Sequence, residues 1–223
     1  MNADDAAALR AAVATVCRRL WERGLIAGPD GNVSVRIAPD RIVVTPAGLS
    51  KVEVTPDDLV EMTLDGRVIG RGRPSSEVQV HLRAYQVRAD VHAVVHAHPP
   101  TATGFAVAGE GFTAPVLPEL LLQVGAVPLV PYETPGSAAL AERCAELFAR
   151  HDALLLANHG AVTLGSTLRE AHQRMESVEH VARILLAARQ LGRVTELTPG
   201  QVAVLIDSHA VPAAPGGGGT SRR

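Results

Sequence analysis

The stretch VVHAHP, residues 94–99, places His96 and His98 two positions apart at the end of an apolar run. Residues two apart on a β-strand share a face, so a strand here would direct both imidazoles to one point. A third histidine, His159, follows a second apolar run, in the sequence ANHG at residues 157–160. Three histidines with a fourth position left open form the usual ligand set of a catalytic zinc ion. The same residues also fit two surface histidines and a turn histidine.

The segment PSSE, residues 74–77, lies just upstream of the histidine pair and has the form of a helix start. Ser75 or Ser76 is expected to cap a helix that runs to about Ala89, with Glu77 in its first turn. Free N–H groups at a helix N-terminus bind anions, and a carboxylate beside a metal is suited to proton transfer. A plain cap followed by a first-turn acid gives the same pattern, and the segment taken alone favours that simpler interpretation.

Periodicity along the chain predicts helices that alternate with strands. Helices are expected over residues 4–22, 137–150, 167–191 and 198–207, with a short one ending at Val107. Strands are expected over residues 31–36, 41–45, 60–64, 68–71, 91–96, 127–130 and 153–157. Some strands form hairpins and others lie between helices, which favours one mixed or antiparallel sheet with helices on both faces. We expect one domain over residues 1–210 and a disordered tail over 211–223, which is rich in proline and glycine.

The composition indicates a globular protein with an aliphatic core, since 47% of its 223 residues are hydrophobic and only 3% are aromatic. A formal net charge of −2 argues against the basic excess of a nucleic-acid-binding surface. No uncharged apolar run approaches the ~20 residues that cross a bilayer, and the N-terminus lacks the features of a signal peptide. We therefore expect a cytoplasmic protein that binds neither nucleic acid nor membrane. Cys17 and Cys144 fall on apolar helix faces and are expected to be buried thiols.

Five short motifs, each weak alone, occur in an order and spacing that resembles the class II aldolase/adducin family. The motifs are Gly31-Asn32-Val33-Ser34, Thr45-Pro46-Ala47-Gly48, Pro74-Ser75-Ser76-Glu77, His96-Ala97-His98-Pro99 and Asn158-His159-Gly160. The resemblance covers about residues 6–190, nearly the whole chain outside the tail. It implies an α/β fold: a single-domain three-layer αβα sandwich with a central, mostly antiparallel sheet. It also implies a homotetramer with sites between subunits.

The resemblance assigns roles to individual residues. His96, His98 and His159 would bind one zinc ion (Zn2+) per subunit, and Glu77 would be the catalytic acid/base and a fourth metal ligand in the absence of substrate. The phosphate of a small sugar phosphate substrate would be held by Gly31, Asn32, Ala47, Gly48, Ser75 and Ser76. Ala47 stands where aldolases of the family carry threonine, which removes one hydroxyl but keeps the backbone N–H contacts.

The activity that the resemblance implies is zinc-dependent cleavage of a ketose 1-phosphate, of the L-fuculose 1-phosphate kind, into dihydroxyacetone phosphate and an aldehyde. Chemistry supports it independently, because such cleavage leaves an enediolate whose negative charge a divalent cation stabilises as a Lewis acid. Dehydratases, decarboxylases and 4-epimerases that act on sugar phosphates share this scaffold and remain alternatives. A non-catalytic adducin-like module that has lost the metal is a further alternative.

Glu119, in Pro118-Glu119-Leu120, aligns near the position where aldolases of the family carry a catalytic tyrosine. A carboxylate there donates a proton only if its pKa is raised. Sugar-phosphate dehydratases of the family also carry a glutamate near this point. Glu119 is therefore a second candidate catalytic residue beside Glu77, the simpler interpretation being a charge at a helix N-terminus. It leaves the substrate and the reaction open.

Overall fold

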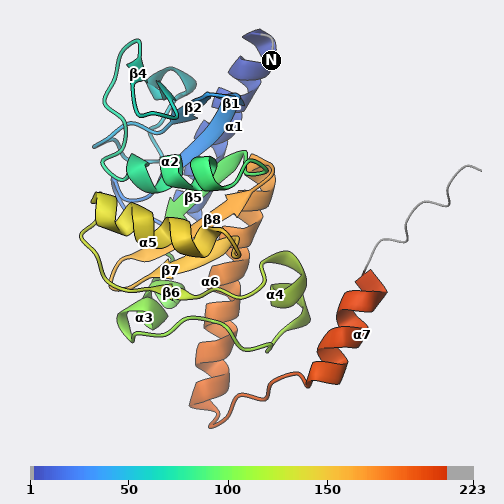
Figure 1. Cartoon of the computed structure of the whole chain (residues 1–223). Helices are drawn as coiled ribbons and strands as arrows, with labels where there is room; N and C mark the ends of the chain where they lie inside the picture. Colours follow the sequence, from blue (N-terminus) through green and yellow to red (C-terminus); the bar gives the residue numbers. More distant parts are fainter. Residues whose placement is uncertain (1–2, 210–223) are drawn as a thin grey trace, which may run out of the picture.

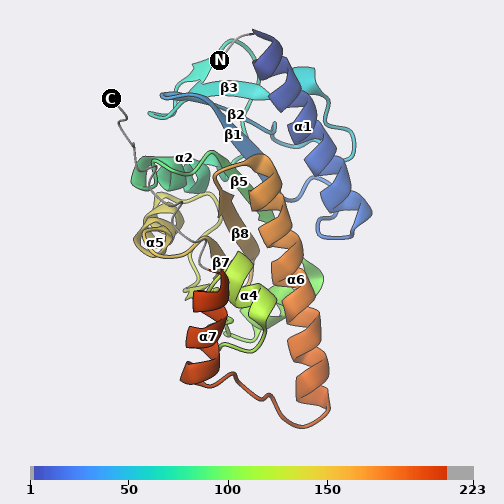
Figure 2. The same ribbon diagram turned by 90° about the vertical axis from the view of Figure 1, so that its right-hand side faces the viewer.

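One eight-stranded sheet organises residues 3–209, the part of the chain that the computed structural model describes (Figure 1). The strand order is β4-β3-β2-β1-β5-β8-β7-β6, and every neighbouring pair is antiparallel except β6 and β7. Helices cover both faces of this sheet, which confirms the expected three-layer αβα sandwich with a mostly antiparallel sheet (Figure 2). The tail predicted to be disordered, residues 211–223, lies outside the described residues.

The strands are short, and most lie where periodicity predicts them. They are β1 (Asn32–Ala38), β2 (Arg41–Val44), β3 (Val60–Thr63), β4 (Val68–Ile69), β5 (Ala93–Ala97), β6 (Leu129–Val130), β7 (Ala153–Leu156) and β8 (Gly160–Gly165). The sequence pattern does not predict β8. Its sequence GAVTLG is buried at every position, so the alternation of polar and apolar residues that marks a half-exposed strand is missing.

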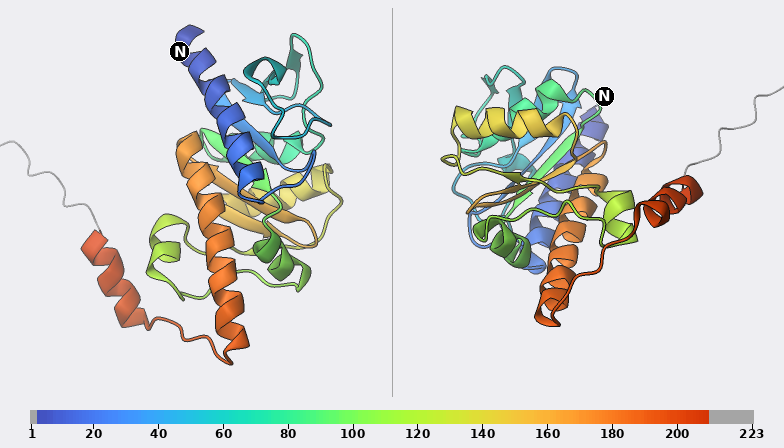
Figure 3. Two further views of the ribbon diagram at one scale, coloured as in Figure 1. Left: turned by 180° about the vertical axis from the view of Figure 1, so that it is seen from behind. Right: turned by 60° about the horizontal axis from the view of Figure 1, so that its bottom comes forward.

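The helices form one layer on each side of the sheet. They are α1 (Ala3–Glu22), α2 (Val78–Val87), α3 (Pro100–Val107), α4 (Pro118–Gln123), α5 (Ala138–Phe148), α6 (Leu168–Gln190) and α7 (Pro199–His209), with a 3-10 turn η1 (Pro56–Asp58). Helices α1 and α6 lie on one face, and α2 and α5 lie on the other (Figure 2). The last helix, α7, extends away from the sheet beyond α4 (Figure 3).

Strand β5 separates two cores and sets the direction of His96. Ala93 and Val95 belong to the core under α1 and α6, whereas Val94 belongs to the core under α2 and α5. Because side chains alternate along a strand, His96 shares the face of Val94. It therefore points to the layer of α2, whose N-terminus carries Glu77.

Helix α2 begins at Val78, later than the sequence predicts. The expectation that Ser75 or Ser76 caps it is wrong, because Glu77 is the N-cap residue. A turn precedes the helix: the Val78 N–H donates to the Ser75 carbonyl at 3.2 Å, and the Glu77 N–H donates to the Ser75 hydroxyl at 3.3 Å. This turn holds Glu77 just outside the helix, which leaves its carboxylate free to face the sheet.

A buried glutamate on α6 fixes the segment that follows the histidine pair. The Glu179 carboxylate accepts hydrogen bonds from the backbone N–H groups of Thr101 and Ala102, each at 3.0 Å. These are free donors of the first turn of α3, which starts directly after His98 and Pro99. Glu179, which is 3% exposed, thus caps a helix of another element and places its negative charge at the positive end of that helix.

No helix within residues 3–209 combines the length and the apolar character that a membrane-spanning segment requires. Cys17 and Cys144 are buried free thiols, as expected.

Candidate metal centre

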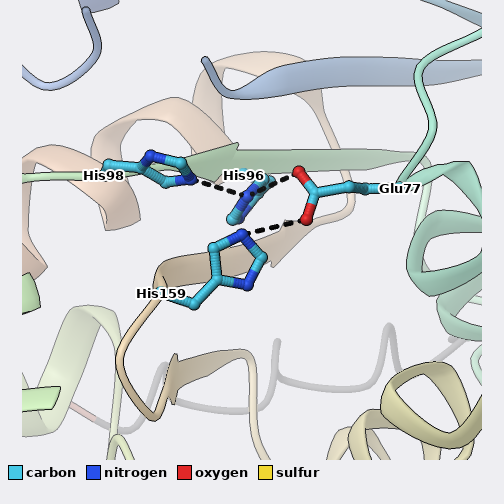
Figure 4. A group of neighbouring side chains, drawn as sticks. All are labelled: Glu77, His96, His98 and His159. Carbon is cyan, nitrogen blue, oxygen red and sulfur yellow. Dashed lines mark hydrogen bonds and ion pairs between the residues drawn. The ribbon is translucent and has the colours of Figure 1, made fainter. Parts of the chain in front are cut away.

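The end of β5 and the turn between β7 and β8 bring the three predicted histidines together (Figure 4). Their ring centroids lie 4.9 Å apart for His96 and His98, 4.8 Å for His96 and His159, and 5.1 Å for His98 and His159. His96 is the most buried of them, and its Nδ1–H donates to the Ala161 carbonyl of β8 at 3.0 Å. That bond fixes the tautomer and leaves Nε2 as the ligand atom.

The β7–β8 turn delivers His159 through an unusual backbone conformation. Asn158 has a positive φ of 56°, in the left-handed region that asparagine tolerates better than most residues. Gly160 follows, and a Cβ there would lie 2.5 Å from the Ala97 carbonyl oxygen and 2.6 Å from the His98 ring. Only glycine lets β8 approach β5 this closely, so Gly160 sets the separation between His159 and His98.

Glu77, at the N-terminus of α2, completes the cluster from the helix layer that faces the histidines. Its Oε2 lies 3.1 Å from His96 Nε2, and its Oε1 lies 2.9 Å from His159 Nε2 (Figure 4). Burial alone would raise the pKa of the Glu77 carboxyl, but His96 and His159 outweigh it and hold the pKa well below its ordinary range. Glu77 is therefore ionised in the cluster.

The donor atoms fit a divalent cation. One ligand atom from each of Glu77, His96, His98 and His159 lies within 4.8 Å of all the others, and the Nε2 atoms of His96 and His98 are 3.1 Å apart. Adjacent ligands of a tetrahedral zinc ion, with bonds of about 2.0–2.1 Å, lie about 3.3 Å apart. Because His96 donates through Nδ1, its Nε2 is the ring nitrogen that faces the Glu77 carboxylate and is available to a cation.

His98 is suited to the same role. Burial, followed by the charges of His96 and His159, lowers its pKa to about 4, so the ring is neutral near pH 7 and has a lone pair for a metal. Its Nδ1 lies 3.6 Å from a carboxylate oxygen of Asp30. Asp30 is not among the residues predicted from the sequence, although its position directly before the Gly31-Asn32 motif is a signal for an outer partner of a metal ligand.

Most residues expected to bind phosphate lie on loops that are joined to one another, whereas Asn32 is the first residue of β1 and its buried side chain bonds to Glu77. The Ala47 N–H donates to the Arg73 carbonyl at 2.9 Å, and the Ser75 N–H donates to the Thr45 carbonyl at 3.1 Å. The loop of Ala47 is thus paired with the segment that leads into Ser75. A Cβ added at Gly48, with φ of +77°, would meet no atom within 4 Å, so this loop borders open space.

Gly31 and Lys51 have structural roles in the loops that are expected to bind phosphate. At Gly31 a Cβ would lie 2.7 Å from the Ile26 side chain and 2.8 Å from the His96 carbonyl oxygen, so Gly31 is required by its contact with β5. The buried Lys51 ammonium donates to the carbonyls of Pro29 at 2.7 Å and Leu49 at 3.0 Å. Lys51 therefore ties the loop before β1 to the loop after β2 and places a positive charge beneath them.

Glu119 lies elsewhere in the described chain. It is an exposed residue in the first turn of α4, and it lines a groove together with Leu117 and His180. The structure does not bring it into the cluster of Glu77 and the three histidines. Within the described chain, the carboxylates near the three histidines are those of Glu77, which contacts His96 and His159, and Asp30, which lies beside His98.

Comparison with known proteins places this geometry in a family. A model described as "Class II Aldolase and Adducin N-terminal domain" matches residues 11–186. The chain is 32% identical over 201 residues to a 3-oxo-tetronate 4-phosphate decarboxylase of Escherichia coli K12, covering 88% of this chain and 94% of the relative. It is 37% identical over 169 residues to an L-fuculose phosphate aldolase of Methanococcus maripaludis, covering 76% and 91%.

Two solved structures are also similar to this chain, one of them described as "a putative aldolase/epimerase/decarboxylase". YgbL from Escherichia coli superposes with a TM-score of 0.84 at 32% identity, covering 90% of this chain and 98% of that one. An L-fuculose 1-phosphate aldolase superposes with a TM-score of 0.84 at 29% identity, covering 93% and 97%.

The cluster predicts metal content. Purified protein reconstituted with a zinc salt should hold about one divalent ion per chain, because three imidazoles and a carboxylate form a complete ligand set. The double change His96→Ala with His98→Ala should abolish binding as measured by elemental analysis. The exposed His92, four residues before His96, gives the control His92→Ala, which should bind like the wild type. A wild-type protein that stays metal-free after reconstitution contradicts the assignment.

Proposed function

The chain belongs to the class II aldolase and adducin family, and on that premise we propose that it is a divalent-metal-dependent lyase that decarboxylates a short 3-oxo sugar acid phosphate. The observation that carries this choice among carbon–carbon cleavages is that, in the described chain, Glu77 is the carboxylate grouped with the ligand atoms of the three histidines, whereas Asp30 contacts the outer nitrogen of His98. The decarboxylase relatives support it, since one matches 88% of this chain and 94% of its own length.

Decarboxylation and aldol cleavage share their central step. A 3-oxo-tetronate 4-phosphate has its ketone two carbons from the carboxylate, so loss of carbon dioxide leaves an enediolate. Protonation of that enediolate at carbon gives dihydroxyacetone phosphate. A ketose 1-phosphate that loses its aldehyde half leaves the same enediolate. A divalent cation held by the three histidines would supply Lewis-acid stabilisation of this negative charge.

The two reactions differ in the proton transfers that they require. Aldol cleavage needs a base for the hydroxyl of the departing aldehyde and a donor for the enediolate carbon. Decarboxylation needs only the donor, because carbon dioxide leaves without a proton. One acid/base group therefore suffices, and Glu77 would carry that proton from water to carbon.

The second candidate is retro-aldol cleavage of a ketose 1-phosphate of the L-fuculose 1-phosphate kind. The aldolase relative at 37% identity and the aldolase structure with a TM-score of 0.84 favour it. This reaction requires a second proton-transfer group, for which Glu119 is our candidate. Because Glu119 is exposed and outside the cluster of its own chain, it would act on the site of a neighbouring subunit in a homotetramer. Zinc as the native metal, the tetramer and a cytoplasmic location belong to the same proposal.

A product assay separates the two reactions. Metal-loaded protein should convert 3-oxo-tetronate 4-phosphate to dihydroxyacetone phosphate and carbon dioxide, and Glu77→Gln should lower turnover by roughly 10²–10⁴-fold because a positioned acid/base is lost. Glu142, which is exposed on α5, gives the control Glu142→Gln with unchanged turnover. Aldehyde release from a ketose 1-phosphate, with no decarboxylation, would select the second candidate. Metal-loaded protein inactive on both substrates contradicts the proposed function.

The phosphate site predicts selectivity. Changing both Ser75 and Ser76 to alanine should raise KM for the phosphorylated substrate by about tenfold, which corresponds to about 1.4 kcal/mol of lost hydrogen bonding. Binding of an analogue without phosphate should change little, because it never makes these contacts. Steady-state kinetics and inhibition by inorganic phosphate measure the effect. Equal losses for both compounds would leave the serines a role only in the turn before α2.

Glu119 distinguishes a one-chain site from a shared one. If it transfers a proton in an aldol cleavage, Glu119→Gln should reduce aldehyde release by about 10²-fold or more while metal content stays unchanged. Mixing Glu119→Gln with Glu77→Gln chains should then restore part of the activity, because some sites combine two intact residues. Unchanged turnover in Glu119→Gln identifies this glutamate as a helix-terminal charge.

A further inference from the structure

Helix α2 and strand β1 meet along a row of polar side chains behind the metal centre. Glu77, His81 and Tyr85 follow one another at intervals of four residues, so they share one face of α2 and its N-cap, and Asn32 and Ser34 share one face of β1. Four residues of helix rise about 6 Å, and two residues of strand rise about 6.6 Å. The two spacings match closely enough for the side chains to interleave.

The interleaved side chains form a continuous hydrogen-bonded chain. Asn32 Nδ2 donates to Glu77 Oε2 at 3.2 Å, and Asn32 Oδ1 is in close contact with His81 Nε2. His81 Nδ1 lies 2.7 Å from the Ser34 hydroxyl, which lies 2.8 Å from the Tyr85 hydroxyl. The order alternates between helix and strand at every step, from Glu77 to Tyr85.

The negative charge of Glu77 fixes which group donates and which accepts at each step of this hydrogen-bonded series. An ionised carboxylate only accepts, so the Asn32 amide must turn its NH2 group to Glu77 and its oxygen to His81. His81 then donates through Nε2–H, and a neutral ring must accept at Nδ1 from the Ser34 hydroxyl. The Ser34 oxygen in turn accepts from Tyr85.

Burial keeps each member in the required form. His81 and Ser34 are fully buried, and Asn32 and Tyr85 are each 2% exposed. Burial lowers the pKa of His81 to about 3, so its ring is neutral and has one N–H. Burial also raises the pKa of the Tyr85 hydroxyl above its ordinary range, so it keeps its proton to donate. A buried chain in which every group has a partner is rigid.

We propose that His81 is a positioning residue, which with Ser34 and Tyr85 fixes the orientation of the Asn32 amide and thereby aims the Glu77 carboxylate at the metal centre. This inference rests on the proposed function in one respect, namely that Glu77 transfers the proton. His81 touches neither metal ligand nor substrate. Without it the amide is free to rotate and turn its oxygen to the Glu77 carboxylate, which repels Glu77 from its productive position.

The first test uses no substrate. In protein labelled with 15N in histidine, the His81 ring, identified by loss of its signals in His81→Gln, should be neutral with its proton on Nε2 at pH 7. In Ser34→Ala the acceptor nitrogen Nδ1 loses its hydrogen-bond donor, so its 15N signal should shift, while the proton stays on Nε2, where the Asn32 oxygen accepts it. A wild-type His81 with its proton on Nδ1, or protonated at pH 7, overturns the proposal even if the reaction is not the one proposed.

The second test asks whether the effect passes through Glu77. Ser34→Ala should lower kcat by roughly 10–100-fold, the usual cost of losing an outer hydrogen-bond partner, with metal content unchanged. In a Glu77→Gln background the same change should add less than about twofold, because the group being aimed is already absent. Equal losses in both backgrounds overturn the proposal.

A matched control separates positioning from stability. Thr163 is also a fully buried strand hydroxyl, and it donates to the Ala171 carbonyl at 2.8 Å on the opposite side of the sheet. Thr163→Val should lower the melting temperature but leave kcat within about twofold. Tyr85→Phe, which removes only the last link, should lower kcat less than Ser34→Ala and serves if that variant does not fold. A loss of kcat in Thr163→Val equal to that in Ser34→Ala contradicts the proposal.

Discussion

The structure is organised around the convergence of four ligand atoms, one from each of Glu77, His96, His98 and His159. Glu77 lies about 3 Å from the Nε2 atoms of His96 and His159, and the imidazoles of His96 and His98 are as near to each other. Such a cluster costs desolvation energy that folding must offset elsewhere. The sheet offsets part of this cost at His96, whose Nδ1–H donates to the Ala161 carbonyl and thereby fixes the orientation of the ring.

One face of the central strands packs into the apolar core, and the other face carries the polar side chains of the candidate site. Toward α1 and α6, strands β1 and β5 present Val33, Val35, Ala93 and Val95, which belong to a continuous apolar core. Toward α2, the same strands present Asn32, Ser34 and His96. These buried polar groups are stable because side chains of α2 and its N-cap form hydrogen bonds or close polar contacts with each of them. The apolar face holds the strands in register, and register is what aligns the polar face.

The loops around the cluster are held by a few specific contacts. Lys51 joins the loops on either side of β1 and β2, the backbone of Ala47 pairs with that of Arg73, and Glu179 holds the start of α3. Each contact links segments far apart in sequence. Negative charge that develops on a bound substrate therefore meets groups that need little reorganisation, which is how enzyme sites gain most of their electrostatic advantage.

Much of this protein follows from its sequence because its signals are local. Period-two and period-3.6 patterns locate most elements, and the HxH spacing on a strand aims His96 and His98 together. The motif order predicts the family and the cluster with His159 and Glu77. Strand β8 does not follow, because burial on both faces removes its alternation, and the true start of α2 depends on a turn that Ser75 and Glu77 form outside the helix.

Other features are decided only by the tertiary structure. The need for Gly160 arises from the distance between two strands, and the pairing of Asn32 with His81 arises from the match between a helix rise and a strand rise. Glu119 shows the converse, since alignment suggests a catalytic place that its own chain does not provide. Sequence determines which groups exist and which face of an element they occupy. Which of those faces meet, and at what distance, is set by packing between segments remote in the chain.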